Sequence, residues 1–294
     1  MFSPNSLVIE KFVGHTVAQF RRAFPGAGAH YEQALKHPSL TALESLLSCD
    51  CPYHDITHTI LVADVGQAIL QGRQLARGDL TPHDWLQAVV AMMFHDIGYI
   101  RTLLRKDGES DCVINPQGQR VTPPRGATDA FMTPYHVTRG AMFIRERFSG
   151  DNSLDTDLIN DCIEMTRFPV PHDLRYRPTD TLPGLVRVAD LIGQMADPQY
   201  FQKLSRLFAE FVEIGAAERM GFSNAGDLHA GFPEFFYHQV HPYIGAGVAY
   251  LKRTQDGQQW IANLYHHLHV NHGSREPDPK VRAPELVIDN VKKR

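Results

Sequence analysis

The sequence predicts an all-α protein, and three observations support that fold class. Apolar residues recur at helical spacing in several separate segments, among them 60–69, 141–148 and 200–212. The segment 85–94 is apolar on every side, which is typical of a helix buried inside a helical bundle. No segment alternates apolar and polar residues in the way a half-buried strand would. We therefore expect roughly ten helices, most of them in one bundle.

Two stretches interrupt the helical pattern. Residues 106–134 are rich in Gly and Pro, and a connection of that length inside a compact domain is often functional. This long loop follows the segment 85–94 closely, so it is placed to cover a site there. Residues 273–294 carry three prolines and are expected to form an extended tail. The interpretation is one all-α domain over residues 1–272, with its core at 45–250, followed by the tail 273–294.

Composition excludes several function classes. The 294 residues carry a formal net charge of −4, which disfavours a nucleic-acid or membrane-surface partner. No apolar run approaches the ~18 residues of a transmembrane helix, and no secretory signal is evident at the start. Four cysteines are too few for a disulfide framework at this length. We expect a cytoplasmic protein, and the sequence does not indicate its oligomeric state.

The dipeptide His95-Asp96 ends the all-apolar segment 85–94 and is the most informative feature of the chain. An uncompensated buried charge there would cost several kcal/mol. A divalent cation is a simple compensation, because imidazole and carboxylate together suit Mn, Fe, Zn or Ni. Asp190 interrupts a second apolar segment, 184–192, so the same argument makes it a candidate ligand.

A further histidine pair, His54 and His58, lies four residues apart and would share one face of a helix. With His58, the candidate ligand set comprises two imidazoles and two carboxylates from three separate helices: His58, His95, Asp96 and Asp190. Helical bundles often build metal sites from inward-facing side chains of this kind. Because each carboxylate oxygen of Asp96 can serve one metal, we expect two divalent ions. The pattern does not distinguish Mn, Mg, Fe, Zn and Ni.

The order of these residues resembles the HD-domain superfamily of metal-dependent phosphohydrolases, in which a histidine precedes a His-Asp pair and a later aspartate. Within it, the segment Tyr53–His58 and the Ala-Asp pair at Asp190 are similar to the cyclic-nucleotide phosphodiesterase fold. The resemblance spans about residues 45–250. Two departures are clear, because Asp55 stands where those enzymes have asparagine and Tyr99 where they have histidine.

The resemblance implies an HD-type helical bundle with a long loop after the HD helix, and a function. The chain would hydrolyse a phosphodiester or phosphomonoester, with a small-molecule phosphate ester such as a nucleotide as its partner. Asp96 and His54 would be catalytic, with His54 as the general acid. Asp55 would orient a neighbouring imidazole through a hydrogen bond. His136 precedes a Gly-Ala helix, as a second-metal ligand does in the HD-GYP group. Candidate substrate-binding residues are Arg101, Arg125 and Gln194.

Two alternatives stay open at this point. HD-type di-iron oxygenases use the same scaffold but need about six protein ligands, including two extra histidines between the HD pair and the last aspartate. His136 and His172 are the candidates for those two positions. The other alternative is a non-catalytic HD module that senses a nucleotide.

Overall fold

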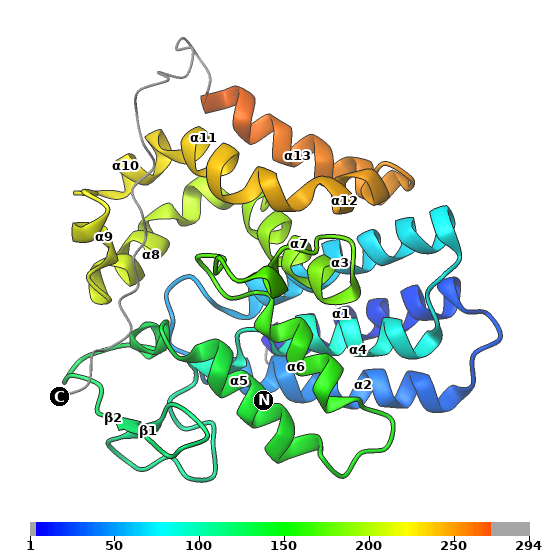
Figure 1. Ribbon diagram of the computed structural model, residues 1–294, viewed down its shortest axis with the longest axis horizontal. Helices are drawn as coiled ribbons and strands as arrows, with labels where there is room; N and C mark the ends of the chain where they lie inside the picture. Colours follow the sequence, from blue (N-terminus) through cyan, green and yellow to red (C-terminus); the bar gives the residue numbers. More distant parts are fainter. Residues whose placement is uncertain (1–3, 272–294) are drawn as a thin grey trace.

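A computed structural model describes residues 4–271 of the chain, so the predicted tail at 273–294 lies outside the described residues. The all-α fold class is confirmed (Figure 1). The α-helices are α1 (Pro4–Ala23), α2 (Ala29–Leu46), α3 (Ile56–Arg77), α4 (Pro82–Phe94), α5 (His136–Phe148), α6 (Thr156–Glu164), α7 (Leu182–Met195), α8 (Tyr200–Glu213), α9 (Ala216–Arg219), α10 (Ala225–Ala230), α11 (Phe232–Phe235), α12 (His241–Leu251) and α13 (Gln255–Asn271).

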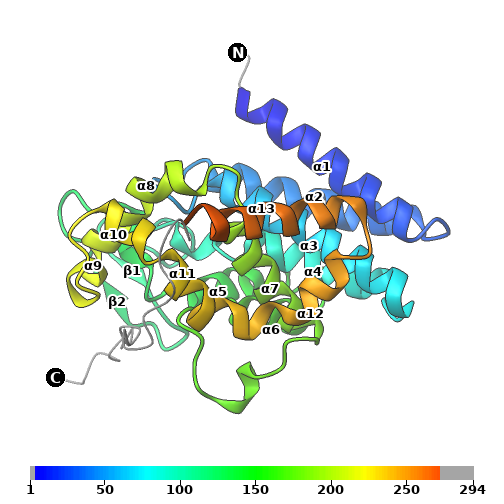
Figure 2. The same cartoon turned by 90° about the horizontal axis from the view of Figure 1, so that it is seen from above.

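Helices α3 and α7 pack against each other at the centre, with α4 alongside both. The side chains of α4 from Trp85 to Phe94 are all buried, as the all-apolar pattern predicted. Close approach of α3 and α7 depends on Gly193, where an added Cβ would lie 2.9 Å from Cα of Val62. Helices α12 and α13 cover the central pair on one side, while α1 and α2 flank it on another (Figures 1 and 2).

Four short turns connect or extend these helices. A 3-10 turn η1 (Ile97–Tyr99) directly follows His95-Asp96, and η2 (Asp129–Met132) precedes α5. The turn η3 (Leu174–Tyr176) lies between α6 and α7, and a π-turn η4 (Phe236–Val240) joins α11 to α12. The first two turns matter most here, because they border the His-Asp pair and the start of α5.

The long connection 101–135 contains a structure that the sequence did not indicate. Strands β1 (Cys112–Val113) and β2 (Arg120–Val121) pair antiparallel, with Cys112 opposite Val121. The hairpin lies at the edge of the molecule, away from α3 and α7 (Figures 1 and 2). Strands of two residues show no alternating pattern, so they are invisible to periodicity analysis.

A buried arginine holds this connection against α5. Arg139 is fully buried and donates hydrogen bonds to the carbonyl oxygens of Gly98, Ile100, Arg101 and Val113. Its guanidinium also pairs with Asp107 at 3.0 Å. The turn after the His-Asp pair, the hairpin and α5 therefore share one polar anchor.

The first and last helices of the described chain differ in how they are packed. The first half of α1 projects from the body of the molecule, where Leu7 and Val8 are exposed (Figure 2). At the other end, His267 of α13 is buried, and its Nδ1 lies 2.9 Å from Met195 O. Within residues 4–271, no helix combines the length and apolarity needed to cross a membrane.

Candidate metal centre

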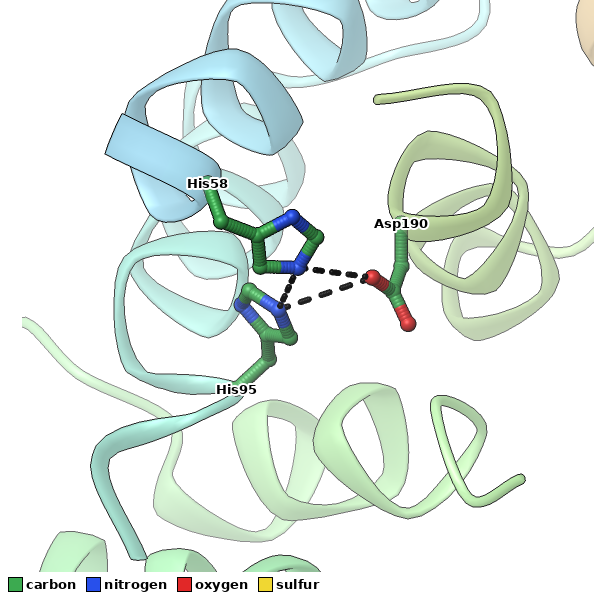
Figure 3. A group of neighbouring side chains, drawn as sticks. All are labelled: His58, His95 and Asp190. Atoms are coloured by element: carbon green, nitrogen blue, oxygen red, sulfur yellow. Dashed lines mark hydrogen bonds and ion pairs between the residues drawn. The ribbon is translucent and has the colours of Figure 1, made fainter. Parts of the chain in front are cut away.

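Three side chains from three helical elements meet at the centre of the bundle (Figure 3). His58 lies in the first turn of α3, His95 directly follows α4, and Asp190 lies in α7. The Nε2 atoms of the two histidines are 3.3 Å apart, and Oδ1 of Asp190 is 3.3 Å and 3.6 Å from them. One ligand atom from each residue lies within 4.8 Å of the others, so this group could hold a metal ion.

Local sequence signals place two of these residues, His58 and Asp190. Asp55 is the N-cap of α3, and its carboxylate accepts hydrogen bonds from the backbone N–H groups of Thr57 and His58. Thr181 caps α7 in the same way, followed by a proline at the first turn. Asp55 therefore starts the helix that carries His58. The role of orienting an imidazole, predicted for Asp55, belongs to Glu210, which contacts Nδ1 of His54.

Backbone carbonyls fix the orientation of two imidazoles. Nδ1 of His95 donates to Met92 O at 2.8 Å, and Nδ1 of His136 donates to Thr133 O at 2.7 Å. Because Nδ1 of each ring is occupied as a donor, Nε2 is the nitrogen that the neutral ring would offer to a cation at the centre. This arrangement is the one that metal-binding histidines usually adopt.

Asp96 lies beside this group with an unsatisfied carboxylate oxygen. Its Oδ2 is buried and has no hydrogen-bond partner, although Nε2 of His95 and His58 lie 3.1 Å and 3.5 Å away. Burial alone would raise the pKa of Asp96, but the positive charge of the neighbouring His95 outweighs burial and holds it well below its usual range. A divalent cation would satisfy this ionised oxygen and the surrounding imidazole nitrogens, so the chemistry of these side chains fits a bound metal ion.

The other oxygen of Asp96 faces His136. Oδ1 lies 3.8 Å from Nε2 of His136, at the start of α5. Burial lowers the pKa of His136 to about 4, so its imidazole is neutral near pH 7 and can act as a ligand. The sequence-predicted set of His58, His95, Asp96, Asp190 and His136 is thus brought to one place, with the two oxygens of Asp96 directed to different imidazoles.

His54 lies at the edge of this cluster and is held by Glu210, a residue that the sequence analysis missed. Nδ1 of His54 is 2.5 Å from Oε2 of Glu210. Oε1 of the same carboxylate accepts the backbone N–H groups of Tyr53 and His54. Burial would lower the pKa of His54, but Glu210 outweighs burial and raises it to about 10. The protonated imidazole therefore lies beside the His/Asp group that could hold a metal ion.

Glu210 could have been found from the pattern of α8. Lys203, Leu204, Leu207 and Glu210 recur at helical spacing, and all four are buried in α8. A carboxylate on the apolar face of an amphipathic helix requires a partner, in the same way as Asp96 and Asp190. Asp96 and Asp190 are conspicuous because they interrupt apolar runs, whereas Glu210 lies in an amphipathic helix that also carries exposed polar residues.

The three predicted substrate-binding residues lie in different settings. Arg101 is paired with Asp129 at 2.6 Å and with Asp50 at 3.0 Å, so most of its donors are engaged. Arg125 is exposed on the long connection. Gln194 is half-buried one turn after Asp190 and is hydrogen-bonded to Tyr200. A substrate-binding role for these residues stays a prediction.

The fold and the site define an all-α protein with an inward-facing His/Asp group that could hold a metal ion. The chain belongs to the Npun_R2479-like family, whose family model matches residues 2–273. No curated protein matches the sequence.

Proposed function

We propose that this protein is a metal-dependent phosphohydrolase of the HD type that acts on a phosphate ester of a nucleotide. The observation that carries the proposal is the orphaned Oδ2 of Asp96, buried among the Nε2 atoms of His58 and His95. The order of the ligands along the chain also resembles the HD superfamily. The order of ligands along the chain and their positions in the structure both select His58, His95, Asp96 and Asp190. The proposal is therefore supported independently by sequence and by geometry.

The described residues provide two groups of ligands for divalent cations. His58, His95, Asp190 and Oδ2 of Asp96 would hold one ion. Oδ1 of Asp96 and Nε2 of His136 would contribute to a second. When bound, such ions supply an activated water near neutral pH and offset the charge of a phosphoryl oxygen.

His54 is the proton donor in this proposal. Its Nδ1 is engaged by Glu210, and Nε2 has no protein partner among residues 4–271. The imidazolium can therefore give the Nε2 proton to the departing alkoxide of a phosphate ester, while Glu210 stabilises the charge and fixes the ring. Because the acid is already protonated near neutral pH, the leaving oxygen needs no other proton source.

No observation favours the two alternatives. The di-iron oxygenase hypothesis needs a second extra histidine near the centre, but His172 is exposed between α6 and α7. Of the two candidates for the extra histidine ligands, His136 alone lies near the centre. A sensing module needs no proton donor, so the His54–Glu210 pair would have no role in it.

The test is metal content and hydrolysis, measured on wild type and on Asp96→Ala. Elemental analysis of wild type should find a divalent metal that Asp96→Ala lacks, because that substitution removes a carboxylate facing three imidazoles. Wild type should also hydrolyse bis(p-nitrophenyl) phosphate or a cyclic or linear dinucleotide with Mn²⁺, and the variant should be at least ~100-fold slower. Asp161→Ala, at an exposed carboxylate of α6, is the matched control and should behave as wild type.

Two results would contradict the proposal. Wild type that binds no metal even after supplementation with Mn²⁺, Fe²⁺, Zn²⁺ and Ni²⁺ would leave only a helical binding module. A stable iron pair with oxygen-dependent turnover and no ester hydrolysis would instead establish the oxygenase alternative.

A further inference from the structure

The side chain of Tyr99 lies between two histidines of the site. Its ring stacks on His54 with centroids 4.8 Å apart and planes at 19°, and on His136 with centroids 4.3 Å apart and planes at 12°. Tyr99 is 2% exposed and lies in η1, three residues after Asp96. Three nearly parallel rings therefore connect the edge of the cluster at His54 with the start of α5 at His136.

Both ends of this stack are held by polar contacts. Glu210 holds His54 through Nδ1, as described above. At the other end, Thr133 contacts two members of the stack, because its side chain is hydrogen-bonded to the Tyr99 hydroxyl and its carbonyl accepts Nδ1 of His136. The hydroxyl of Tyr99 is thus engaged by Thr133, so the residue presents its ring to the histidines rather than a ligand atom to a metal.

We infer that Tyr99 is a positioning residue that sets the places of His54 and His136 at the same time. This inference rests on the proposed function, in which His54 donates a proton and His136 binds the second cation. A flat ring between two imidazoles fixes their separation and their tilt, because offset stacking tolerates little rotation without loss of contact. An aliphatic side chain of similar size offers no flat face, so both imidazoles would gain freedom.

The chosen variants separate the ring from the hydroxyl. Tyr99→Phe keeps the stack and loses the bond to Thr133, whereas Tyr99→Leu loses the stack. Phe148→Leu is the matched control, since Phe148 is a buried aromatic residue at the far end of α5 and is not part of the site. Thermal unfolding of all three variants shows which of them keep the native fold under the conditions of the measurements.

Titration of the metal-free protein with Mn²⁺ by calorimetry is the main measurement. In Tyr99→Leu, the weaker of the two Mn²⁺ binding steps, assigned to the ion that His136 would hold, should lose about 10–100-fold in affinity, because residues that orient metal ligands contribute on that scale. The affinity of the tighter step should stay unchanged. Tyr99→Phe and Phe148→Leu should stay near wild type. With an ester that wild type hydrolyses, Tyr99→Leu should lower kcat at least ~10-fold with little change in KM. Tyr99→Phe should keep most of the wild-type kcat.

The outcomes distinguish this inference from the proposed function. Wild type that binds two Mn²⁺ ions but hydrolyses no ester would overturn the proposed function, while the titration would still test the placement of His136. A single binding step in wild type, equal Mn²⁺ affinities in wild type and Tyr99→Leu, or loss of both steps together would overturn the role of Tyr99. Loss of only the weaker step, restored by Tyr99→Phe, would support it.

Discussion

Two regions bring ligands to the same centre by different means. His58 and Asp190 are carried by α3 and α7, and His95 directly follows α4; these three helices pack through the apolar core. His136 and Tyr99 are instead placed by the long connection 101–135 and its junction with α5, where hydrogen bonds to Arg139 and Thr133 add to a small apolar cluster around Tyr99. Apolar packing therefore builds one half of the site, and buried polar bonds contribute strongly to the other half.

The difference has an energetic consequence. Apolar packing is distributed over many residues, so the loss of one contact is partly absorbed by its neighbours. A buried polar anchor concentrates many contacts in one side chain, and its loss leaves several unpaired groups behind. The region around His136 should therefore be more sensitive to single substitutions than the region around His58.

The largest effect is expected for Arg139→Met. This change leaves Asp107 and four carbonyl oxygens without their buried donor, so the free energy of unfolding should fall by about 3–5 kcal/mol. Urea unfolding followed by circular dichroism measures it. Arg120→Met breaks the exposed pair with Asp111 in the same connection and should leave stability unchanged within error. Equal effects of the two substitutions would show that Arg139 is not the anchor of this region.

A smaller effect is expected for Gly98→Ala, at the junction of the two regions. A Cβ on residue 98 would lie 1.9 Å from the carbonyl oxygen of His136, so η1 and α5 must move apart. The free energy of unfolding should fall by about 1–3 kcal/mol, the usual cost of overpacking. The affinity of the weaker Mn²⁺ binding step should fall as well, because His136 moves with α5. Gly245→Ala in α12, where an added Cβ meets nothing within 4 Å, is the control and should be neutral or slightly stabilising. Unchanged stability in Gly98→Ala would mean that the junction is plastic.

The smallest effect is a pH dependence from the contact between α8 and the site. The pKa of His54 is raised to about 10 by Glu210, so this pair stabilises the metal-free protein fully below about pH 6.5 and less as the pH rises toward 10. With EDTA present, the free energy of unfolding should fall by at most about 1.4 kcal/mol between pH 7 and pH 8. Glu210→Gln should flatten this part of the profile, measured by urea unfolding at pH 6 to 9. The same slope in both proteins would place the pH dependence elsewhere.

The same contrast explains how much could be predicted from the sequence. The all-α class and the convergence of His58, His95 and Asp190 follow from apolar periodicity, because a polar residue inside an apolar run is conspicuous. The spacing of Lys203, Leu204, Leu207 and Glu210 marks Glu210 as a buried carboxylate, but its partner His54 lies 156 residues away. A local pattern can therefore indicate that a buried carboxylate needs a partner, but it does not identify that partner.

Asp55 and the hairpin illustrate two other limits. A carboxylate one residue after His54 looks like an orienting group, yet its position directly before a helix makes it an N-cap. The hairpin of Cys112–Val113 and Arg120–Val121 is too short to show a period of two. Arg139, with its five partners, sits in a segment that reads as an ordinary amphipathic helix. In each case the deciding contact is tertiary and polar.

The carbonyl contacts of His95 and His136 also bear on how fast an ion would be captured. Met92 O and Thr133 O already hold both rings with Nε2 facing inward, so neither imidazole has to turn over or exchange tautomers when an ion arrives. The slow step of capture then becomes the ion's own loss of water. Mg²⁺, which gives up water reluctantly, should enter more slowly than larger and more labile cations, whatever their final affinities.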